Sequence, residues 1–380
     1  MPDFYEFFAG GGMARSGLGP GWNCLFANDF DPKKAAAYRA NFGAEGFRLG
    51  DVAEVAPADL PGVADLAWAS FPCQDLSLAG SGAGLKGARS GAFFPFWDVM
   101  AGLAAEGRAP AIIALENVCG ALTSHGGQDF AVICRTYAQA GYRAGALVIN
   151  AELFLPQSRP RLFVVGVRAD VEIPEALLAA APRAPFHTAA LQGAVTRLPD
   201  HLRAALLWWS LPEPPPRRRS LADVIDDAPE GVTWHSPAET RQLLSLMSPL
   251  NLEKVEAARR SGRRIVGGVY RRTRRNHNGA KTQRAEARFD DVSGCLRTPA
   301  GGSSRQVIIA VEGDAVRTRL ISARETARLM GLPDAYRLPA TYNEAYHLTG
   351  DGVAVDVVRH LARYVFEPIL GRAAPLRDVA

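Results

Sequence analysis

Residues 1 to about 170 alternate short apolar runs with segments of helical periodicity. The apolar runs have the length of buried strands, and helical segments of about 10–15 residues lie between several of them. This alternation predicts βαβ units and a mostly parallel sheet, which is an α/β fold. The strand-like runs are Asp3–Phe8, Asn23–Asn28, Asp65–Phe71, Ala111–Leu115, Arg143–Asn150 and Leu162–Val167, and the helical segments are Pro32–Asn41, Phe93–Ala105 and Gln128–Ala140.

The regular alternation ends after residue 167. Prolines interrupt the next stretch repeatedly, and this predicts a smaller, irregular, strand-containing second domain. An amphipathic helix is expected over Ser322–Met330, with Ser322 as the N-cap and Glu325 at the capping-box position. Residues 346–366 again have strand- and helix-like patterns. We therefore expect a first domain over 1–185, a second domain over 186–322, and a segment over 323–380 that returns to the first domain.

The net charge of +4 conceals a strongly basic segment. Between Arg259 and Arg288 there are 11 Lys or Arg residues and one acid, Glu286, so this segment carries about +10 and the rest of the chain about −6. A basic segment on a mildly acidic protein favours a polyanionic partner. The alternative is an arginine-rich surface that only contacts solvent.

Neither a membrane segment nor a metal site is indicated. No apolar run approaches the roughly 18 residues of a membrane span, and the N-terminus lacks the basic region of a signal peptide. The five cysteines are odd in number and widely spaced. This argues against a disulfide framework and against a zinc site, and it fits a reducing cytoplasm.

Pro72-Cys73-Gln74 is the most informative motif. It follows the apolar run that ends at Phe71, so a thiol lies just past the carboxyl end of a buried strand, where open α/β sheets bind their ligands. The stretch 75–91 is too rich in glycine to be core and has the composition of a flexible lid. A cysteine in this position is expected to act as a nucleophile.

Glycines and acids follow the strands that come earlier in the chain. The loop from Phe8 through Gly10 to Gly12 follows the first strand and opens a helix, so its backbone can approach a nucleoside cofactor. Asp29 ends the second strand, where an acid commonly accepts from ribose hydroxyls. Asp51 could accept from an adenine amino group. Each acid alone could equally be a helix cap, whereas three such groups in order favour a cofactor site.

Glu116 and Asn117 follow the apolar run 111–115. A carboxyl group at the end of a buried strand must be paired or protonated, and near the thiol it could donate a proton. A structural ion pair is the alternative. Arg159 and Arg161 are two residues apart near the start of a strand and are expected to share one face. Arg161 could then hold Glu116, and Arg159 a polar edge or a phosphate.

Together these motifs resemble those of DNA cytosine-5 methyltransferases in order and spacing. The resemblance covers about 1–170 and 290–370 and implies a Rossmann-like class I methyltransferase fold. It makes 1–185 the S-adenosylmethionine-binding catalytic domain, 186–322 the target-recognition domain and 323–380 a hinge and C-terminal segment. The matching segments are Phe8-x-Gly10-x-Gly12, Asn28-Asp29, Gly50-Asp51-Val52, Phe71-Pro-Cys-Gln-Asp-Leu-Ser77, Glu116-Asn-Val118, Gln157-x-Arg159-x-Arg161, Arg319-Leu-Ile-Ser-Ala-Arg-Glu325 and Ala345-Tyr-His-Leu-Thr-Gly-Asp-Gly-Val353.

The resemblance implies a sequence-specific enzyme that flips cytosine out of double-stranded DNA and methylates its C5 through a covalent bond between Cys73 and C6. Glu116 would protonate N3 and Arg161 would orient Glu116, with Arg159 completing the catalytic group. The implied S-adenosylmethionine contacts are Phe8, Gly10, Gly12, Asp29, Asp51, Val52, Pro72, Asn117 and Asp351. The implied DNA contacts are Gln74, Ser77, Arg89, Arg271, Arg272, Arg274 and Arg275, and no metal is expected. The implied setting is a cytoplasmic monomer, with a cognate restriction endonuclease as an allowed partner.

Three positions depart from the pattern of this family. Asp351 stands where Asn is usual, which is either a tolerated replacement or a change in the environment of the cofactor's sulfonium. Glu6 stands where Asp is usual and is expected to be without consequence. Cys295 stands where Thr is usual, and if that hydroxyl binds phosphate, Thr298 or Ser303 would have to substitute.

Other functions remain open on the sequence. The same chemistry on RNA, as in the tRNA-modifying branch of the fold, is disfavoured by the long basic segment. A catalytically silent DNA-binding homologue is disfavoured by the presence of Cys73, Glu116, Arg159 and Arg161 together. A dinucleotide dehydrogenase is more distant, because its chemistry does not need Pro-Cys-Gln.

Overall fold

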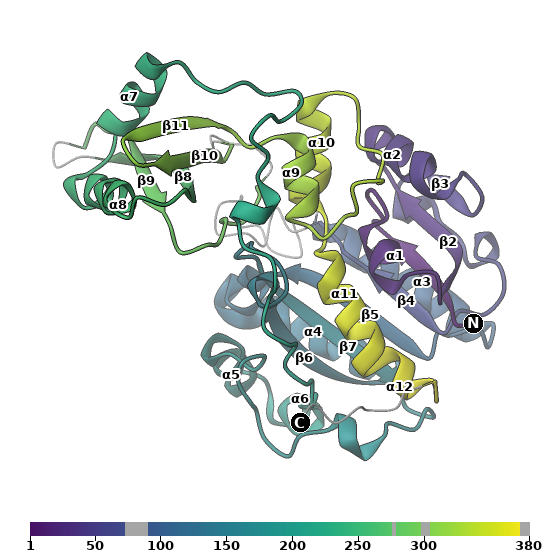
Figure 1. Cartoon of the computed structure of the whole chain (residues 1–380). Coiled ribbons are helices and arrows are strands. Elements are labelled where there is room, and N and C mark those ends of the chain that lie inside the picture. The colour runs from purple at the N-terminus through teal and green to yellow at the C-terminus, as the bar shows by residue number, and fades with distance from the viewer. Residues whose placement is uncertain (73–89, 276–278, 298–304, 373–380) are drawn as a thin grey trace. The chain divides into compact units, whose positions relative to one another are not determined.

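The computed structural model describes residues 1–72, 90–275, 279–297 and 305–372 of the chain (Figure 1). The chain packs as two compact units, each assembled from separate stretches of sequence. Unit 1 comprises Met1–Asn150, Pro160–Pro214 and Val355–Ala380, and unit 2 comprises Ala151–Arg159 and Pro215–Ala354. The backbone therefore passes from one unit to the other four times.

Unit 1 contains a seven-stranded sheet in the order β3-β2-β1-β4-β5-β7-β6. Neighbouring strands are parallel except at β7, which is antiparallel to both β5 and β6. This confirms the predicted α/β fold with a mostly parallel sheet, and it brings the carboxyl ends of β1, β2, β4 and β5 to one edge. The strands are β1 (Asp3–Phe7), β2 (Asn23–Asp29), β3 (Phe47–Leu49), β4 (Leu66–Ala69), β5 (Ile112–Val118), β6 (Tyr142–Asn150) and β7 (Pro160–Arg168).

Helices cover both faces of this sheet (Figure 1). On one face, Phe7 of β1 packs with Phe96 of α3, their ring centroids 5.1 Å apart, within the main apolar core. On the other face α1 packs against α11, and Gly17 allows this approach because a Cβ there would lie 2.4 Å from the Cβ of Val358. The helices of unit 1 are α1 (Met13–Leu18), α2 (Pro32–Phe42), α3 (Phe93–Ala105), α4 (Gln128–Gln139), α5 (Ala189–Thr196), α6 (Asp200–Ala205), α11 (Val355–Leu361) and α12 (Glu367–Ile369).

Unit 2 contains a four-stranded antiparallel sheet in the order β11-β10-β8-β9. Helices α7 and α8 contribute to a separate apolar core that includes Met247, Val255, Val269 and Ile309. The elements of unit 2 are α7 (Pro237–Ser245), α8 (Pro249–Arg260), β8 (Ile265–Arg275), β9 (Lys281–Arg288), β10 (Val307–Glu312), β11 (Ala315–Leu320), α9 (Ala323–Arg328) and α10 (Tyr342–Asp351). The antiparallel sheet confirms the expected smaller, strand-containing part of the chain.

The capping box predicted for α9 is present. Ser322 Oγ accepts from the backbone N–H of Glu325 at 3.2 Å, and the backbone N–H of Ser322 donates to Glu325 Oε2 at 2.7 Å. Glu325 also forms an ion pair of 2.6 Å with Arg319 of β11, and both side chains are fully buried. The cap therefore fixes α9 to the end of β11.

Two expectations about local structure are wrong. Residues 346–366 are helical apart from a break at 352–354 and contain no strand; Val355, Val357 and Val358 are buried in α11, where tertiary packing outweighs the β preference of valine. Strand β7 begins at Pro160, so Arg159 precedes the strand and does not share a strand face with Arg161.

The packing boundaries at residues 150, 159, 214 and 354 differ from the expected domain boundaries at 185 and 322. The expected boundaries concern function and remain predictions. None of the helices in the described ranges is both long enough and apolar enough to cross a bilayer.

Candidate functional site

The ends of β4 and β5 meet at the carboxyl edge of the sheet of unit 1. The two strands are parallel, with Ala69 opposite Leu115, so the residues that follow each strand lie next to one another. Asn117 is 4% exposed, and its Nδ2 donates to the carbonyl oxygen of Phe71 at 3.0 Å. This hydrogen bond fixes the backbone two residues before Cys73. Cys73, Gln74, Ser77 and Arg89 themselves lie outside the described residues.

Glu116 and Arg161 form the ion pair expected from the sequence. Val118 of β5 is opposite Arg161 of β7, so Glu116 is a diagonal neighbour of Arg161 on the same face of the sheet. Glu116 Oε1 lies 3.3 Å from Arg161 Nε, and the two side chains are 8% and 15% exposed. The pair holds a carboxyl group in a fixed orientation beside the segment that leads to Cys73. Its catalytic role remains a prediction.

A second thiol lies close to this pair. Cys119 begins a 3₁₀ turn over Cys119–Leu122 directly after β5 and is partly buried. Burial raises the pKa of the Cys119 thiol, and the charge of Arg161 opposes that shift. Cys119 is therefore disfavoured as a thiolate at neutral pH.

The glycine loop after β1 has a left-handed backbone at three positions. The φ angles of Phe8, Gly10 and Gly12 are 56°, 55° and 74°. A Cβ at Gly10 would meet nothing within 4 Å, whereas one at Gly12 would lie 2.4 Å from the ring of Phe42. The space beside Gly10 is therefore open to a ligand, and Gly12 is required by packing against α2.

Asp29 stabilises the glycine loop by a hydrogen bond to its backbone. It is 6% exposed, and its two carboxylate oxygens accept from the backbone N–H groups of Gly10 and Asp31, each at 2.8 Å. Burial raises the pKa of Asp29, and the charge of Lys34 opposes this. A carboxylate has about four lone-pair sites, so Asp29 can also accept from a ligand hydroxyl. The predicted ribose contact remains a prediction.

Asp51 is exposed and caps a 3₁₀ turn over Val52–Glu54, with its Oδ1 accepting from Ala53 N at 3.0 Å. Val52 is 3% exposed and belongs to the core. Phe30, which was not among the expected site residues, is 64% exposed and follows Asp29 directly. The available signal in the sequence was an aromatic residue between two acids, Asp29 and Asp31, because an aromatic ring at a strand end can stack on a base.

Glu6 of β1, which stands where Asp is usual, is a buried carboxyl group. Its side chain is 1% exposed, and Oε1 accepts from Arg15 N at 3.3 Å. Its Oε2 has no hydrogen-bond partner within the part of the chain that the structure describes. Burial raises the pKa of Glu6 from 4.5 to about 8. A carboxyl group with a raised pKa therefore lies next to the N-terminal part of α1. The expectation that Glu in place of Asp is without consequence stays a prediction.

Arg159 belongs to unit 2, where it joins two segments far apart in the sequence. Its Nη2 donates to the carbonyl oxygens of Gly350 and Gly352, at 2.9 and 2.6 Å, on either side of Asp351. Its Nη1 donates to Leu296 O at 3.1 Å and lies 3.3 Å from Cys295 Sγ. Arg159 is 2% exposed, so it positions the backbone around Asp351, which is itself exposed at the end of α10.

The remaining predicted contacts lie elsewhere in the fold. Pro72 is half-buried at the end of the described segment. Arg271 and Arg272 are exposed on β8, and Arg274 and Arg275 occupy its last positions. Thr298 and Ser303, proposed as substitutes at the position of Cys295, lie outside the described residues.

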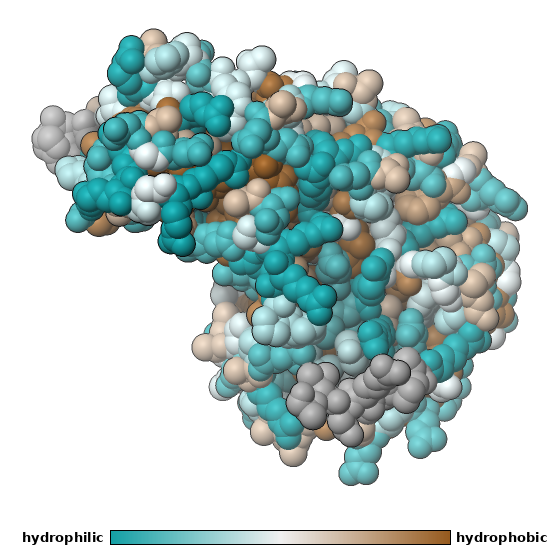
Figure 2. Space-filling model, in the orientation of Figure 1, coloured by the Kyte–Doolittle hydropathy of each residue, from teal (hydrophilic) through white to brown (hydrophobic). Residues whose placement is uncertain are grey.

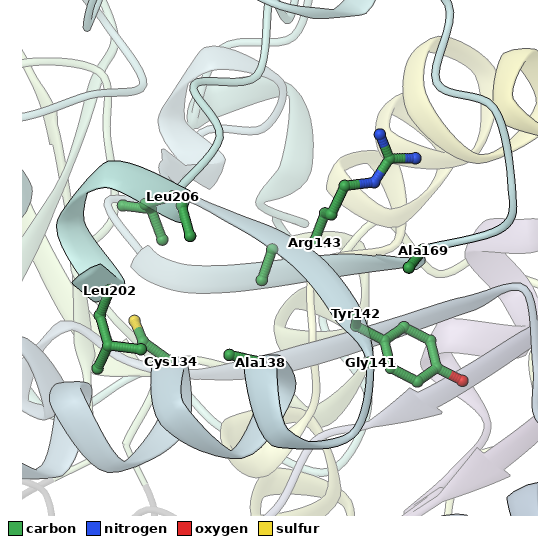
Figure 3. Close-up of a pocket in the computed structure, with 10 residues that line it drawn as sticks. Cys134, Ala138, Gly141, Tyr142, Arg143, Ala169, Leu202 and Leu206 are labelled. Atoms are coloured by element: carbon green, nitrogen blue, oxygen red, sulfur yellow. The ribbon is translucent and has the colours of Figure 1, made fainter.

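A small, mostly apolar pocket lies between α4, α6 and the start of β6 (Figure 3). Its lining includes Cys134, Tyr142, Leu202 and Leu206. Strand β6 runs parallel to β5, since both are antiparallel to β7, so its first residues lie at the edge opposite Glu116. The pocket is therefore separate from the candidate site. No cluster of metal-ligating side chains occurs within the described ranges.

Comparisons with known proteins agree with this arrangement. Residues 3–367 match the family model described as C-5 cytosine-specific DNA methylase. The type II methyltransferase M.NgoBI of Neisseria gonorrhoeae is 25% identical over 355 residues, covering 93% of this chain and 89% of that protein. The type II methyltransferase M.NlaX of Neisseria lactamica is 26% identical over 362 residues, covering 94% of both.

A solved structure has the same fold. The methyltransferase EhMeth of Entamoeba histolytica aligns with a TM-score of 0.64 at 13% identity, covering 97% of this chain and 99% of that one. The structural likeness concerns the fold alone, whereas the family model spans nearly the whole sequence. The chain therefore belongs to the family of C-5 cytosine-specific DNA methylases and is an enzyme of the DNA cytosine-5 methyltransferase class.

Proposed function

We propose that the protein methylates C5 of a cytosine within a specific sequence of double-stranded DNA, with S-adenosylmethionine as the methyl donor. The observation that carries this proposal is the junction at the ends of β4 and β5. There Asn117 holds the backbone two residues before Cys73, and Glu116 pairs with Arg161. These contacts support a site in which Cys73 is the nucleophile, Glu116 the proton donor and Arg161 the positive charge.

The chemistry follows from these groups. C5 of cytosine is a poor nucleophile until a group adds to C6. The Cys73 thiolate forms a bond to C6, the C5–C6 double bond shifts to C4–C5, and the C4–N3 double bond opens toward N3, which takes a proton from Glu116. S-adenosylmethionine, when bound, supplies the methyl group that C5 then takes. A base removes the C5 proton, the C5–C6 double bond forms again, and Cys73 leaves as the thiolate. N3 returns its proton to Glu116, and the neutral ring again has its C4–N3 double bond.

The residues at the ends of β1, β2 and β3 fit this methyl donor. Open space beside Gly10 admits a ligand close to the backbone, and the exposed ring of Phe30 offers a stacking surface for adenine. We assign the ribose hydroxyls to Asp29 and the adenine amino group to Asp51. The contacts of Phe8, Gly12, Val52, Pro72, Asn117 and Asp351 with the donor are part of the same proposal.

DNA is the proposed partner. The ring atoms of a stacked cytosine are out of reach of a side chain, so the base must leave the duplex. The basic segment Arg259–Arg288 belongs to unit 2 and supplies positive charge for phosphates. We propose a monomer in the bacterial cytoplasm, with a restriction endonuclease of the same specificity as a possible second component.

The substrate is tested with the full chain and S-adenosylmethionine labelled in its methyl group. The protein is incubated with duplex genomic DNA or with total tRNA, and the label in each is counted. We expect label in DNA only. Label confined to tRNA would move the activity to RNA, and label in neither would identify a silent homologue.

The covalent step is tested with duplex DNA in which 5-fluorocytosine replaces cytosine. The fluorine cannot leave as a proton does, so the bond between Cys73 and C6 persists and the complex survives denaturing electrophoresis. Cys73→Ser should abolish this complex, and Cys119→Ser, which removes the thiol three residues after Glu116, should retain it. The opposite pattern would assign the nucleophile to Cys119.

A further inference from the structure

Strands β8 and β9 extend beyond the four-stranded sheet of unit 2. Strand β10 pairs with β8 only over Ile265–Val269. The later part of β8, from Tyr270 to Arg275, pairs with β9 alone. We call this two-stranded antiparallel segment the ribbon (β8 270–275 with β9 281–286). A two-stranded ribbon is narrow enough to enter the major groove of DNA.

The strand register sorts the ribbon's residues onto two faces, because directly opposed residues of an antiparallel pair share a face. Val269 lies opposite Ala287, and Arg271 lies opposite Ala285. Val269, Ala285 and Ala287 are buried in the core that includes residues of α7 and α8. Arg271 therefore lies on the helix side of the ribbon, and it is exposed.

The opposite face has two arginines directly across from one another. Arg272 lies opposite Arg284, and Tyr270 lies opposite Glu286. Both arginines are exposed. Arg272 Nε lies 3.3 Å from Glu286 Oε2. Like charges in directly opposed positions destabilise a sheet. Within the ribbon, Glu286 is the one acid beside Arg272 and Arg284, so the face keeps a positive charge and fits an anionic or acceptor-rich partner.

The face that carries Arg272 and Arg284 also packs against the segment that binds Arg159. The hydroxyl of Tyr270 lies against Gly294, where an added Cβ would be 2.1 Å away. Leu296, two residues further on, accepts from Arg159. Arg159 is separated from Arg161 by a single residue of the chain. Hydrophilic residues dominate the face of unit 2 seen in Figure 2.

We infer that Arg272 and Arg284 read guanines of the target sequence from the major groove, and that Glu286 is a positioning residue for Arg272. A guanidinium donates two parallel hydrogen bonds to O6 and N7 of guanine, which no other base accepts in the same way. Arg271, on the other face, contacts phosphate or solvent and carries no sequence information. This inference rests on the proposed function and adds that the target contains guanines read by two identified side chains.

The test begins with the recognition sequence of the wild-type protein. Unmethylated DNA is treated with the full chain and S-adenosylmethionine, and 5-methylcytosine is mapped by bisulfite sequencing. Initial rates are then measured on duplexes in which each guanine of the site is replaced in turn by adenine. Arg272→Gln should lose about 5- to 150-fold of discrimination at one guanine, the span of one bidentate contact. Arg284→Gln should do so at another guanine.

Three further variants separate base reading from charge and from folding. Arg272→Lys keeps the charge but not the paired donors, so it should lose the same discrimination while keeping affinity for DNA. Glu286→Gln should lose part of the discrimination at the guanine assigned to Arg272 and none at the other. Arg271→Gln is the matched control: it should keep the recognition pattern and lower the salt dependence of binding by at most about one ion.

The outcomes distinguish the inference from the function on which it rests. If the wild type methylates a defined site but Arg272→Gln and Arg284→Gln keep its full discrimination, the inference is wrong and the function stands. The inference is also wrong, and the function stands, if Arg271→Gln relaxes the recognition of the target sequence. If the wild type methylates no DNA, the proposed function fails and the inference fails with it.

Discussion

The wild-type protein should become less stable as the pH rises through the titration of Glu6. Replacing Glu6 with Gln should remove this pH dependence. The Glu6 side chain is 1% exposed, and only its Oε1 has a hydrogen-bond partner among the described residues, the backbone N–H of Arg15. Burial raises the pKa of Glu6 from 4.5 to about 8. Glutamine has nearly the shape of the protonated carboxyl group and stays neutral at every pH.

The sign and the size follow from proton linkage. Above pH 4.5 the unfolded chain releases the Glu6 proton, whereas the folded chain keeps it up to about pH 8. The folded state therefore binds more protons in this window, and stability falls as the pH rises, by about 1.4 kcal/mol per pH unit. Relative to Glu6→Gln, the wild type should lose up to about 5 kcal/mol across the whole window.

Urea unfolding at a series of pH values between about 5 and 8 measures this difference. Tryptophan fluorescence is suitable because the two units differ in tryptophan content: unit 1 contains Trp22, Trp68, Trp97, Trp208 and Trp209, and unit 2 contains Trp234. The midpoint of the wild type should fall progressively below that of Glu6→Gln as the pH rises. Glu45→Gln, at an exposed acid, is the control and should show no such trend. A midpoint difference between wild type and Glu6→Gln that does not change with pH would refute the buried-carboxyl argument.

Three other predictions concern the edge of the sheet. Arg161→Ala releases its carboxylate partner and should lower kcat about 10- to 100-fold with little change in the KM for DNA; equal kcat in steady-state assays would contradict this. Asn117→Ala leaves a buried carbonyl without its donor and should destabilise the protein by about 1–3 kcal/mol and slow methyl transfer, as thermal unfolding and single-turnover rates would measure. Gly12→Ala should be more damaging than Gly10→Ala in thermal unfolding, because both have positive φ but only Gly12 has an aromatic ring 2.4 Å from the new Cβ; equal losses would mean that packing is not the cause.

The parallel strands could be predicted because their burial on both faces makes them mostly apolar, with few polar positions. The runs that became β1, β4 and β5 are of this kind. The reversed direction of β7 could not be predicted, because a central antiparallel strand buried on both faces has the same composition as a parallel one. The ribbon could not be predicted from the sequence for a different reason. Between Arg271 and Arg275 most positions on both faces are arginine, so no alternation of apolar and polar residues indicates a strand.

The site was predicted to the extent that it depends on strand ends. Glu116 and Arg161 could be paired from sequence because each adjoins an apolar run, and neighbouring strands bring such positions together. The contacts of Arg159 could not be predicted from the sequence. Its partners Leu296, Gly350 and Gly352 are more than 130 residues away in the chain. The burial of Glu6 depends in the same way on α1 folding back over the strand.

The short stretch 151–159 limits how this enzyme's specificity could be transplanted. It packs with 215–354, although 55 residues of unit 1, at 160–214, lie between the two pieces in the sequence. A chimera that exchanged only 215–354 with a relative would leave the native Arg159 facing foreign carbonyl groups in place of Leu296, Gly350 and Gly352. A functional graft therefore has to exchange both pieces together, with the join before β7 placed ahead of Pro160.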